Sequence, residues 1–97
     1  MSVYLIANLT INDRDRYTQY EDAFMDVFDN YNGKILAVDE DQEVIEGDYD
    51  RTRTVLIEFP SNEDAKAWYG SDAYQEIAQH RWASSDAAVI MIAGIPD

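Results

Sequence analysis

The first and last hydrophobic runs of the chain are apolar on both faces of the strands that they predict. The first, VYLIANLT, spans Val3–Thr10, and the last, AAVIMIAG, spans Ala87–Gly94. A strand that is apolar on both faces is typical of a sheet covered on both sides. A chain of 97 residues forms a single domain with few elements available for that cover. The sequence therefore predicts a sheet with one face that needs a further partner.

Helical patterns separate these runs. Over residues 12–33, apolar side chains recur every three or four residues, which predicts an amphipathic helix. Asn12 or Asp13 is placed to cap its start, and Gly33 is placed to end it. A second helical region is split, because Ser61 can cap a short first segment and Ser71 can cap a second one, SDAYQEIAQHRW.

Three more strands are expected in the middle of the chain. They are KILAV, a short EVIEG strand that ends at Gly47, and TVLIEF over Thr54–Phe59. Without the short extra strand, the order is the β-α-β-β-α-β of a ferredoxin-like α+β fold, with helices on one face of the sheet. A second copy of the same sheet is the economical cover for the other face, so we expect one domain over residues 1–97 that pairs as a homodimer.

The charge of the chain limits its partners. Twenty acidic residues against seven basic ones give a net charge of −13. Phosphate backbones and anionic membranes are bound through clustered Lys and Arg, so nucleic acid and membrane are not expected as partners. The chain has no cysteine, which excludes disulfides and thiol nucleophiles and fits a reducing compartment. Because the N-terminal run lacks the basic segment of a signal peptide, we expect a cytoplasmic protein.

The ordered motifs resemble those of the bacterial family known as domain of unknown function 1330. The resemblance covers essentially the whole chain and rests on DRYTQYEDAF, YNGKIL, EVIEGDY, TVLIEFPSNEDAKAWYGSDAYQ and QHRWASSDAAVIMIAG. The chain departs from the family at Asn32, where the family often has Gly, and at Asp72, where it often has Pro. His80 is not part of the family pattern.

This resemblance implies a fold and an oligomer but no reaction. The family belongs to the dimeric α/β-barrel superfamily, in which two ferredoxin-like sheets face each other. Relatives in the superfamily include cofactor-free monooxygenases, muconolactone isomerases, haem-dependent chlorite dismutases and stress-responsive binding domains. Transferring any of these activities to this chain would be an analogy at the level of the fold.

The segment Ser71–Trp82 holds the most informative candidates for a site. At about 100° per residue, Arg81 falls in the middle of the apolar helix face with Tyr74, and His80 falls on the flank. An inward arginine needs a partner, and Glu58 is the acid within an otherwise apolar strand. Arg81 and Tyr74 predict either a structural ion pair or a clamp for a carboxylate or enolate. Glu58 or His80 is the candidate for proton transfer, although a flank histidine is more often a surface residue.

Three further residues are candidates for binding a ligand. Asn8 and Tyr4 share one face of the first strand, and Trp68 lies on the short helix. Each has an alternative interpretation as a strand-end residue or as core packing. We expect no metal site and no cofactor, because His80 has no partners for zinc or haem and no nucleotide-binding motif occurs.

Three functional hypotheses follow from the sequence. The first is a cofactor-free enzyme, such as a monooxygenase or an isomerase, that acts on an anionic or enolisable organic molecule. The second is a ligand-binding or stress-response domain without turnover. The third is a dimer whose polar residues have only structural roles.

Overall fold

The computed structural model describes residues 1–96 and has three helices beside one four-stranded sheet. The elements are β1 (Val3–Ile11), α1 (Arg14–Phe28), β2 (Lys34–Asp39), β3 (Arg53–Phe59), α2 (Asn62–Tyr69), α3 (Asp72–Ser84) and β4 (Ser85–Ala93). The strand order is β2-β3-β1-β4, and all neighbouring strands are antiparallel. This is the predicted ferredoxin-like α+β fold with a split second helix.

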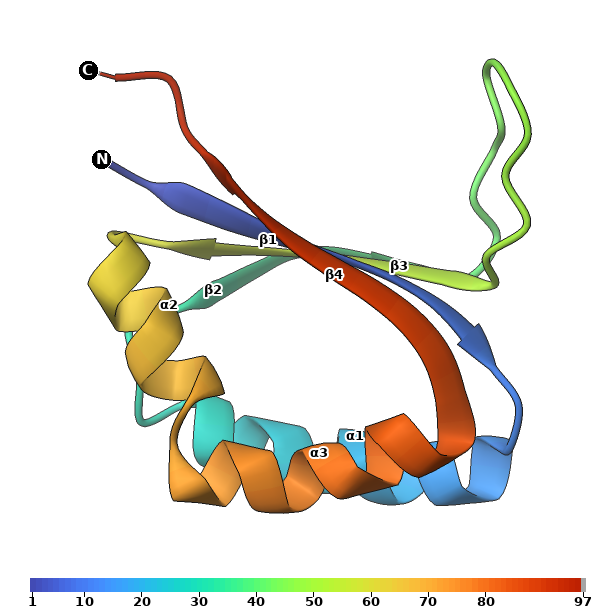
Figure 1. Ribbon diagram of the computed structural model, residues 1–97, viewed down its shortest axis with the longest axis horizontal. Helices are drawn as coiled ribbons and strands as arrows, with labels where there is room; N and C mark the ends of the chain where they lie inside the picture. The colour runs from blue at the N-terminus through green and yellow to red at the C-terminus, as the bar shows by residue number, and fades with distance from the viewer. Residues whose placement is uncertain (97) are drawn as a thin grey trace.

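All three helices lie on the same side of the sheet (Figure 1). Side chains alternate between the two faces of a strand, and on β1 the buried residues Val3, Leu5 and Leu9 face the helices. Ile57 and Phe59 on β3 continue this face into the core. The opposite face, which we call the bare face, has no element laid flat across it in Figure 1.

Capping side chains fix the helix starts as predicted. Asp13 accepts a hydrogen bond from the Arg16 amide at 3.2 Å, and Ser61 accepts one from the Asp64 amide at 3.1 Å. The hydroxyl of Ser71 accepts the corresponding bond from the Tyr74 amide, also at 3.1 Å. These bonds satisfy amide groups that have no partner within the helix.

Gly33 has a different role from the predicted one. Helix α1 already ends at Phe28, where the side-chain amide of Asn30 donates to the Asp26 carbonyl oxygen at 2.8 Å. A Cβ atom on Gly33 would lie 2.5 Å from the Phe28 ring and 2.7 Å from the Phe59 ring. The glycine is therefore required by close packing beneath the helix end.

The predicted EVIEG strand is absent from the described residues. Residues 43–47 belong to no strand, and Gly47 has a φ of 84° in a bend. Strand β2 pairs directly with β3, and residues 43–47 pair with neither strand among the described residues. Residues 40–52 instead form an arm that rises from the bare face at the end of the sheet opposite the two termini (Figure 1). Within the described chain, no helix is long and apolar enough to cross a membrane.

Candidate ligand-binding cavity

A cavity of about 190 Å³ lies between the sheet and helix α1. All four strands and all three helices contribute to its wall. From the sheet, Leu5, Ala7 and Leu9 of β1 form the floor, and Ile57 of β3 continues it. For comparison, an apolar cavity of about 150 Å³ binds benzene. The space therefore matches a molecule with a single ring.

Aromatic side chains form the helical wall of the cavity. Tyr20 and Tyr74 join α1 to α3 through a hydrogen bond of 2.9 Å between their hydroxyl groups. The Trp68 ring packs against Tyr74 with the ring centroids 4.3 Å apart. Burial raises the pKa of the Tyr20 phenol well above its ordinary value, and the Tyr74 hydroxyl adds to this shift. At neutral pH, Tyr20 is therefore an un-ionised phenol.

Arg81 lies on the same wall, with only 6% of its surface exposed. Among residues 1–96, no carboxylate lies within ion-pair distance of its guanidinium group. Burial lowers the pKa of Arg81, but the nearby Tyr74 and Tyr20 phenols outweigh burial, so its pKa is raised overall. The cavity is thus lined by a permanent positive charge whose protein neighbours are phenols.

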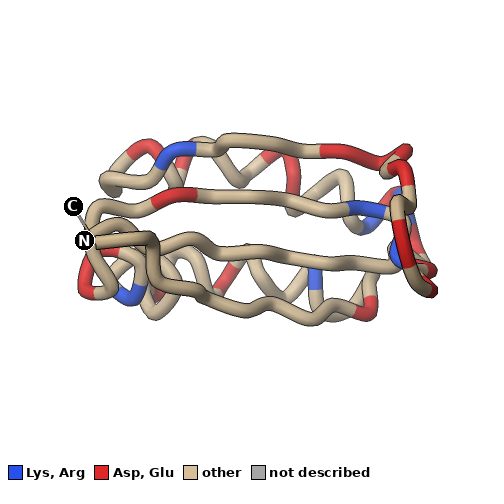
Figure 2. The backbone as a smooth tube through the Cα atoms, turned by 90° about the horizontal axis from the view of Figure 1, so that it is seen from above, with Lys and Arg blue, Asp and Glu red and all other residues tan. Residues whose placement is uncertain are grey.

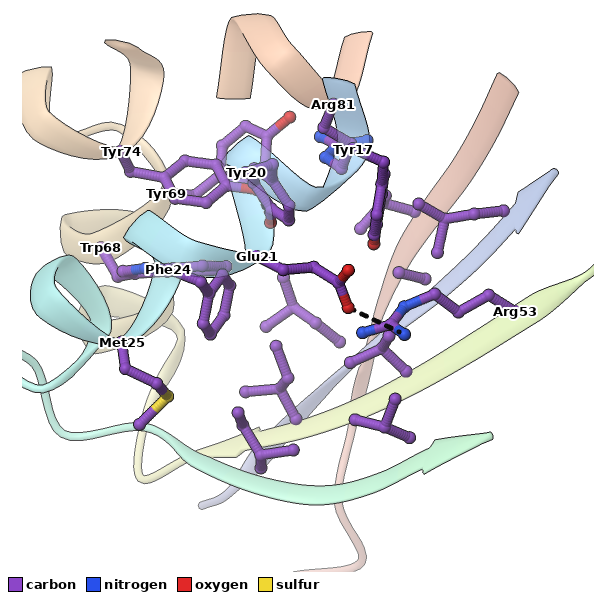
Figure 3. Close-up of a pocket in the computed structure, with 18 residues that line it drawn as sticks. Tyr17, Tyr20, Glu21, Phe24, Met25, Arg53, Trp68, Tyr69, Tyr74 and Arg81 are labelled. Atoms are coloured by element: carbon purple, nitrogen blue, oxygen red, sulfur yellow. Dashed lines mark hydrogen bonds and ion pairs between the residues drawn. The ribbon is translucent and has the colours of Figure 1, made fainter. Parts of the chain in front are cut away.

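Arg53 adds a second guanidinium from the sheet. Its Nη1 atom lies 3.3 Å from a Glu21 oxygen and 2.8 Å from a Glu40 oxygen. Arg14 also pairs with Glu40 and lies 3.6 Å from Glu21. The guanidinium carbon of Arg53 lies 5.4 Å from the centroid of the Tyr17 ring. Figure 3 shows the Glu21–Arg53 pair beside Tyr17, with Arg81 beyond it.

The cavity has a charge opposite to that of the whole chain. Its charged lining residues are Arg53, Arg81 and Glu21, which is two positive charges against one negative charge. The chain as a whole has a net charge of −13. A locally positive, largely apolar space is complementary in charge and polarity to an anion with a hydrophobic body.

Two buried donors in the cavity lining lack a partner among the described residues. They are Nε of Arg53 and Nε1 of Trp68. Buried donors are normally satisfied, and an exception is commonly explained by an absent water or ligand. Both atoms are themselves buried in the packing around the cavity.

The cavity has an open polar neighbour on the side of α3 and β4. This hollow shares Tyr69, Arg81 and Val89 with the cavity and adds Trp82 and Asp86 to its own lining. Arg81 therefore borders the inner cavity and a region open to solvent.

The structure brings three of the seven predicted site residues together. Arg81, Tyr74 and Trp68 all line the cavity. Arg81 lies inside the apolar face of α3, as its helical position predicts, with Tyr74 and Ala78 also buried. Tyr74 also has the predicted position beside Arg81.

The other four predicted residues lie elsewhere. Glu58, Asn8 and Tyr4 alternate with buried neighbours and point to the bare face, where Glu58 lies opposite Tyr4 in the strand register. The predicted Arg81–Glu58 ion pair is therefore wrong, because the sheet separates the two side chains. The Asn8 side-chain oxygen accepts a hydrogen bond of 2.7 Å from the Tyr49 hydroxyl at the base of the arm. The Nδ1 atom of His80 accepts one of 3.1 Å from Nε of Arg16, which ties α3 to α1.

The cavity also has polar lining residues that are not among the predicted site residues, including Tyr17, Tyr20 and Glu21 of α1. Arg53 precedes the predicted strand Thr54–Phe59 and is the first residue of β3. One signal was present: Arg53 is in phase with Val55 and Ile57, so the alternation of β3 places it on the buried face.

Several solved structures share this fold. RPA0582 from Rhodopseudomonas palustris, a protein of unknown function, aligns with a TM-score of 0.83 and 16% identity over 99% of this chain and 84% of its own. A dimeric ferredoxin-like protein of unknown function from Thermobifida fusca aligns with a TM-score of 0.69 and 18% identity over 96% of this chain and 91% of its own. SnoaB from Streptomyces nogalater, a cofactor-independent oxygenase, aligns with a TM-score of 0.70 and 10% identity over 99% of this chain and 95% of its own. At these identities, the likeness shows the fold alone.

A family model gives the sequence-level result. No protein of curated function matches the chain. The model described as Domain of unknown function (DUF1330) matches residues 2–95, which is nearly the whole chain and confirms the resemblance seen in the ordered motifs. The chain belongs to the DUF1330 family.

Proposed function

We propose that the cavity binds a small organic anion, with a carboxylate, phenolate or enolate group placed against Arg81. The observation that carries this proposal is a buried guanidinium without a carboxylate partner among the described residues. A buried guanidinium whose ionisable neighbours are phenols has no opposite charge beside it, and a bound anion supplies one. Tyr74 donates a hydrogen bond to the same anion, and Trp68 packs against its body.

The shape of the cavity limits the rest of the ligand. About 190 Å³ accommodates one ring or a short branched chain, and the apolar floor of β1 favours a hydrophobic body. Hydroxybenzoates and cyclic enols have this chemistry.

In the catalytic form of the proposal, the protein is a cofactor-free monooxygenase or isomerase. An enolate is the charge that develops when a proton is removed beside a carbonyl group, and Arg81 and Tyr74 would stabilise it. Glu21 replaces Glu58 and His80 as the proposed proton acceptor, because it is a carboxylate in the cavity wall. SnoaB, a cofactor-independent oxygenase of similar fold, supports this form only by analogy.

The proposal includes a homodimer formed through the bare face. Ile90 and Ile92 of β4 are 52% and 46% exposed and pair in register with Ile6 and Tyr4 of β1. The similar structure from Thermobifida fusca is described as dimeric. A second copy covers this apolar strip without changing the cavity on the other side of the sheet.

The second candidate is a binding domain without turnover, which is favoured by the ion pairs that Glu21 makes with Arg53 and Arg14. Those pairs occupy both carboxylate oxygens of Glu21. Oxygen uptake and isomerisation assays with an enol or quinol panel separate the two forms. Turnover that Glu21→Gln abolishes supports the enzyme, whereas tight binding without turnover supports the binding domain.

Fluorescence titration tests the common claim. Trp68 lines the cavity, so a Trp82→Phe background leaves it as the single tryptophan reporter. Benzoate and salicylate are expected to bind, and their neutral amides are expected to bind much more weakly. Arg81→Met removes a charge-assisted hydrogen bond of about 1.5–3 kcal/mol and should weaken anion binding by about tenfold to a hundredfold.

Two controls make this titration decisive. Tyr74→Phe removes a neutral hydrogen bond and should have a smaller effect, about three- to tenfold. The neutral amides should lose little affinity in Arg81→Met. If Arg81→Met binds benzoate as tightly as the parent does, the assignment of Arg81 as the anion clamp is wrong.

A further inference from the structure

The arm contains a strand-like segment that pairs with no strand among the described residues. Over residues 43–47, the sequence has the composition of a short strand, and the described residues show no strand there. Val44 is 47% exposed and Ile45 is 86% exposed. Apolar side chains this exposed on a projecting segment are typical of an interaction site.

The base of the arm is held in place, so the projecting segment has a defined position. The Tyr49 hydroxyl donates to the Asn8 side-chain oxygen at 2.7 Å, and the Gln42 amide donates to the Thr54 hydroxyl at 2.8 Å. Glu40 pairs with Arg53 at 2.8 Å. These contacts hold the arm upright beside the bare face (Figure 1), so any body that covers this face meets the arm.

The two edges of the sheet differ in how they are protected. The β2 edge has six residues, a register shift between Ile35 and Ala37, and charged residues at both ends, Lys34 and Asp39. Bulges and charges are the usual protection of an edge strand against further pairing. The β4 edge has nine residues, and its stretch Ala87–Ala93 has no charge and no proline. Figure 2 shows this uncharged strand at one side of the sheet and the acidic arm at one end.

An apolar groove runs beside the unprotected edge on its helix side. It has a volume of about 290 Å³ and is lined by Val89, Ile90 and Met91 of β4 together with Ala65, Lys66 and Tyr69 of α2 and Leu5 of β1. Neighbouring residues of a strand point to opposite faces. A strand added at this edge would therefore place one of Val44 and Ile45 in the groove and the other on the bare face.

The arm and the groove also have opposite charges. Glu43 and Glu46 flank the two apolar residues of the arm, and Lys66 is the charged residue of the groove lining. We infer that residues 43–47 of one subunit pair as an added strand along β4 of the partner subunit, with Lys66 facing the acidic flank of the arm. This inference rests on the proposed homodimer and adds the contact that would close the two exposed β4 edges.

Hydrogen exchange of the intact protein tests the pairing directly. In the described structure, the amides of residues 43–47 take part in no backbone hydrogen bond, so an unpaired arm exchanges at the rate of a free chain. Pairing should slow these amides at least tenfold at concentrations where the protein is dimeric. Fast exchange in a sample that sedimentation shows to be dimeric would overturn the inference and leave the dimer intact.

Cross-linking tests the partner strand. The chain has no cysteine, so Ile45→Cys subunits mixed with Ile90→Cys subunits carry unique thiols for a short bis-maleimide. A heterodimer cross-link is expected with Ile90→Cys, and none with Gln79→Cys on the exposed side of α3. A cross-link only to Gln79→Cys would overturn the placement on β4.

Two charge variants test the groove. Ile45→Asp and Lys66→Glu should each weaken the dimer at least tenfold in sedimentation, whereas Trp82→Asp, an exposed residue on the helix layer, should not. Weakening by Trp82→Asp alone would contradict the inference. A parent protein that is monomeric at all concentrations would overturn both this inference and the proposed dimer.

Discussion

At the scale of single residues, the central feature is Arg81. Its place in the helix period, beside Tyr74 and Ala78, puts it in the core-facing side of α3. Its surroundings are phenols and not acids, so it contributes little as a structural ion pair. Under the proposed function, a bound anion accounts for the position of this arginine.

This interpretation predicts how the protein tolerates Arg81→Met. Replacing a buried, carboxylate-free charge by an apolar side chain of similar length is expected to leave the free energy of unfolding unchanged or to raise it by about 1–4 kcal/mol. Thermal unfolding without added ligand measures the change, with Arg81→Lys as a control that retains the charge. A loss of more than about 2 kcal/mol in Arg81→Met would favour a structural role instead.

Gly33 supports a second prediction at this scale. A methyl group at this position would lie within 2.7 Å of the Phe28 and Phe59 rings, so Gly33→Ala should destabilise the fold by about 1–3 kcal/mol through overpacking. At Gly70, the added Cβ would lie 3.1 Å from the Lys66 carbonyl oxygen. Gly70→Ala is therefore the matched control, with a smaller expected loss in urea unfolding. Equal losses in the two variants would contradict the packing argument.

At the scale of elements, the strands and helices with long periodic patterns could be predicted from the sequence, and the arm could not. Local features predict the strands β1, β3 and β4 and the caps of the three helices. The structure has these strands and caps where the sequence predicts them. A strand also needs a neighbour, and residues 43–47 have none within the described chain. Glu58 is out of phase with Val55 and Ile57 in the sequence, so the alternation of β3 was already a signal that it faces away from the helices and from Arg81.

The base of the arm predicts a dependence on pH. The hydrogen bond from Arg14, helped by Arg53, lowers the pKa of the Glu40 carboxyl below its ordinary value. A carboxyl with a lowered pKa stabilises the folded state above its unfolded pKa of about 4.3, and this stabilisation is lost as the pH falls through the lower, folded value. The difference in stability between the parent and Glu40→Gln should therefore be present at pH 7 and vanish in strong acid. Urea unfolding at pH 7 and near pH 3 measures it, and a difference that grows in acid would contradict this account.

At the scale of the whole molecule, the acidic surface opposes self-association. Two copies bring together a net charge of −13 each, and the arm alone has six acidic residues over positions 40–50. Salt screens such repulsion, because the Debye length falls from about 30 Å at 0.01 M to about 10 Å at 0.1 M. Apolar contacts between the bare faces are not weakened by this screening.

The dimer is therefore expected to tighten as salt is added. Sedimentation velocity between 0.01 M and 0.5 M sodium chloride should show a falling dissociation constant, with the largest change below 0.1 M. A dissociation constant that rises with salt would indicate that ion pairs, and not apolar faces, hold the two copies together.

The proposed selectivity of the cavity for anions is tested most directly by native mass spectrometry of the protein offered an equimolar mixture of benzoate, salicylate and their neutral amides. Our account predicts a dimer that retains up to one acid per subunit and no amide, and a dimer of Arg81→Met that retains neither. A dimer that retains acids and amides equally, or that binds the acids equally well after Arg81→Met, would contradict it.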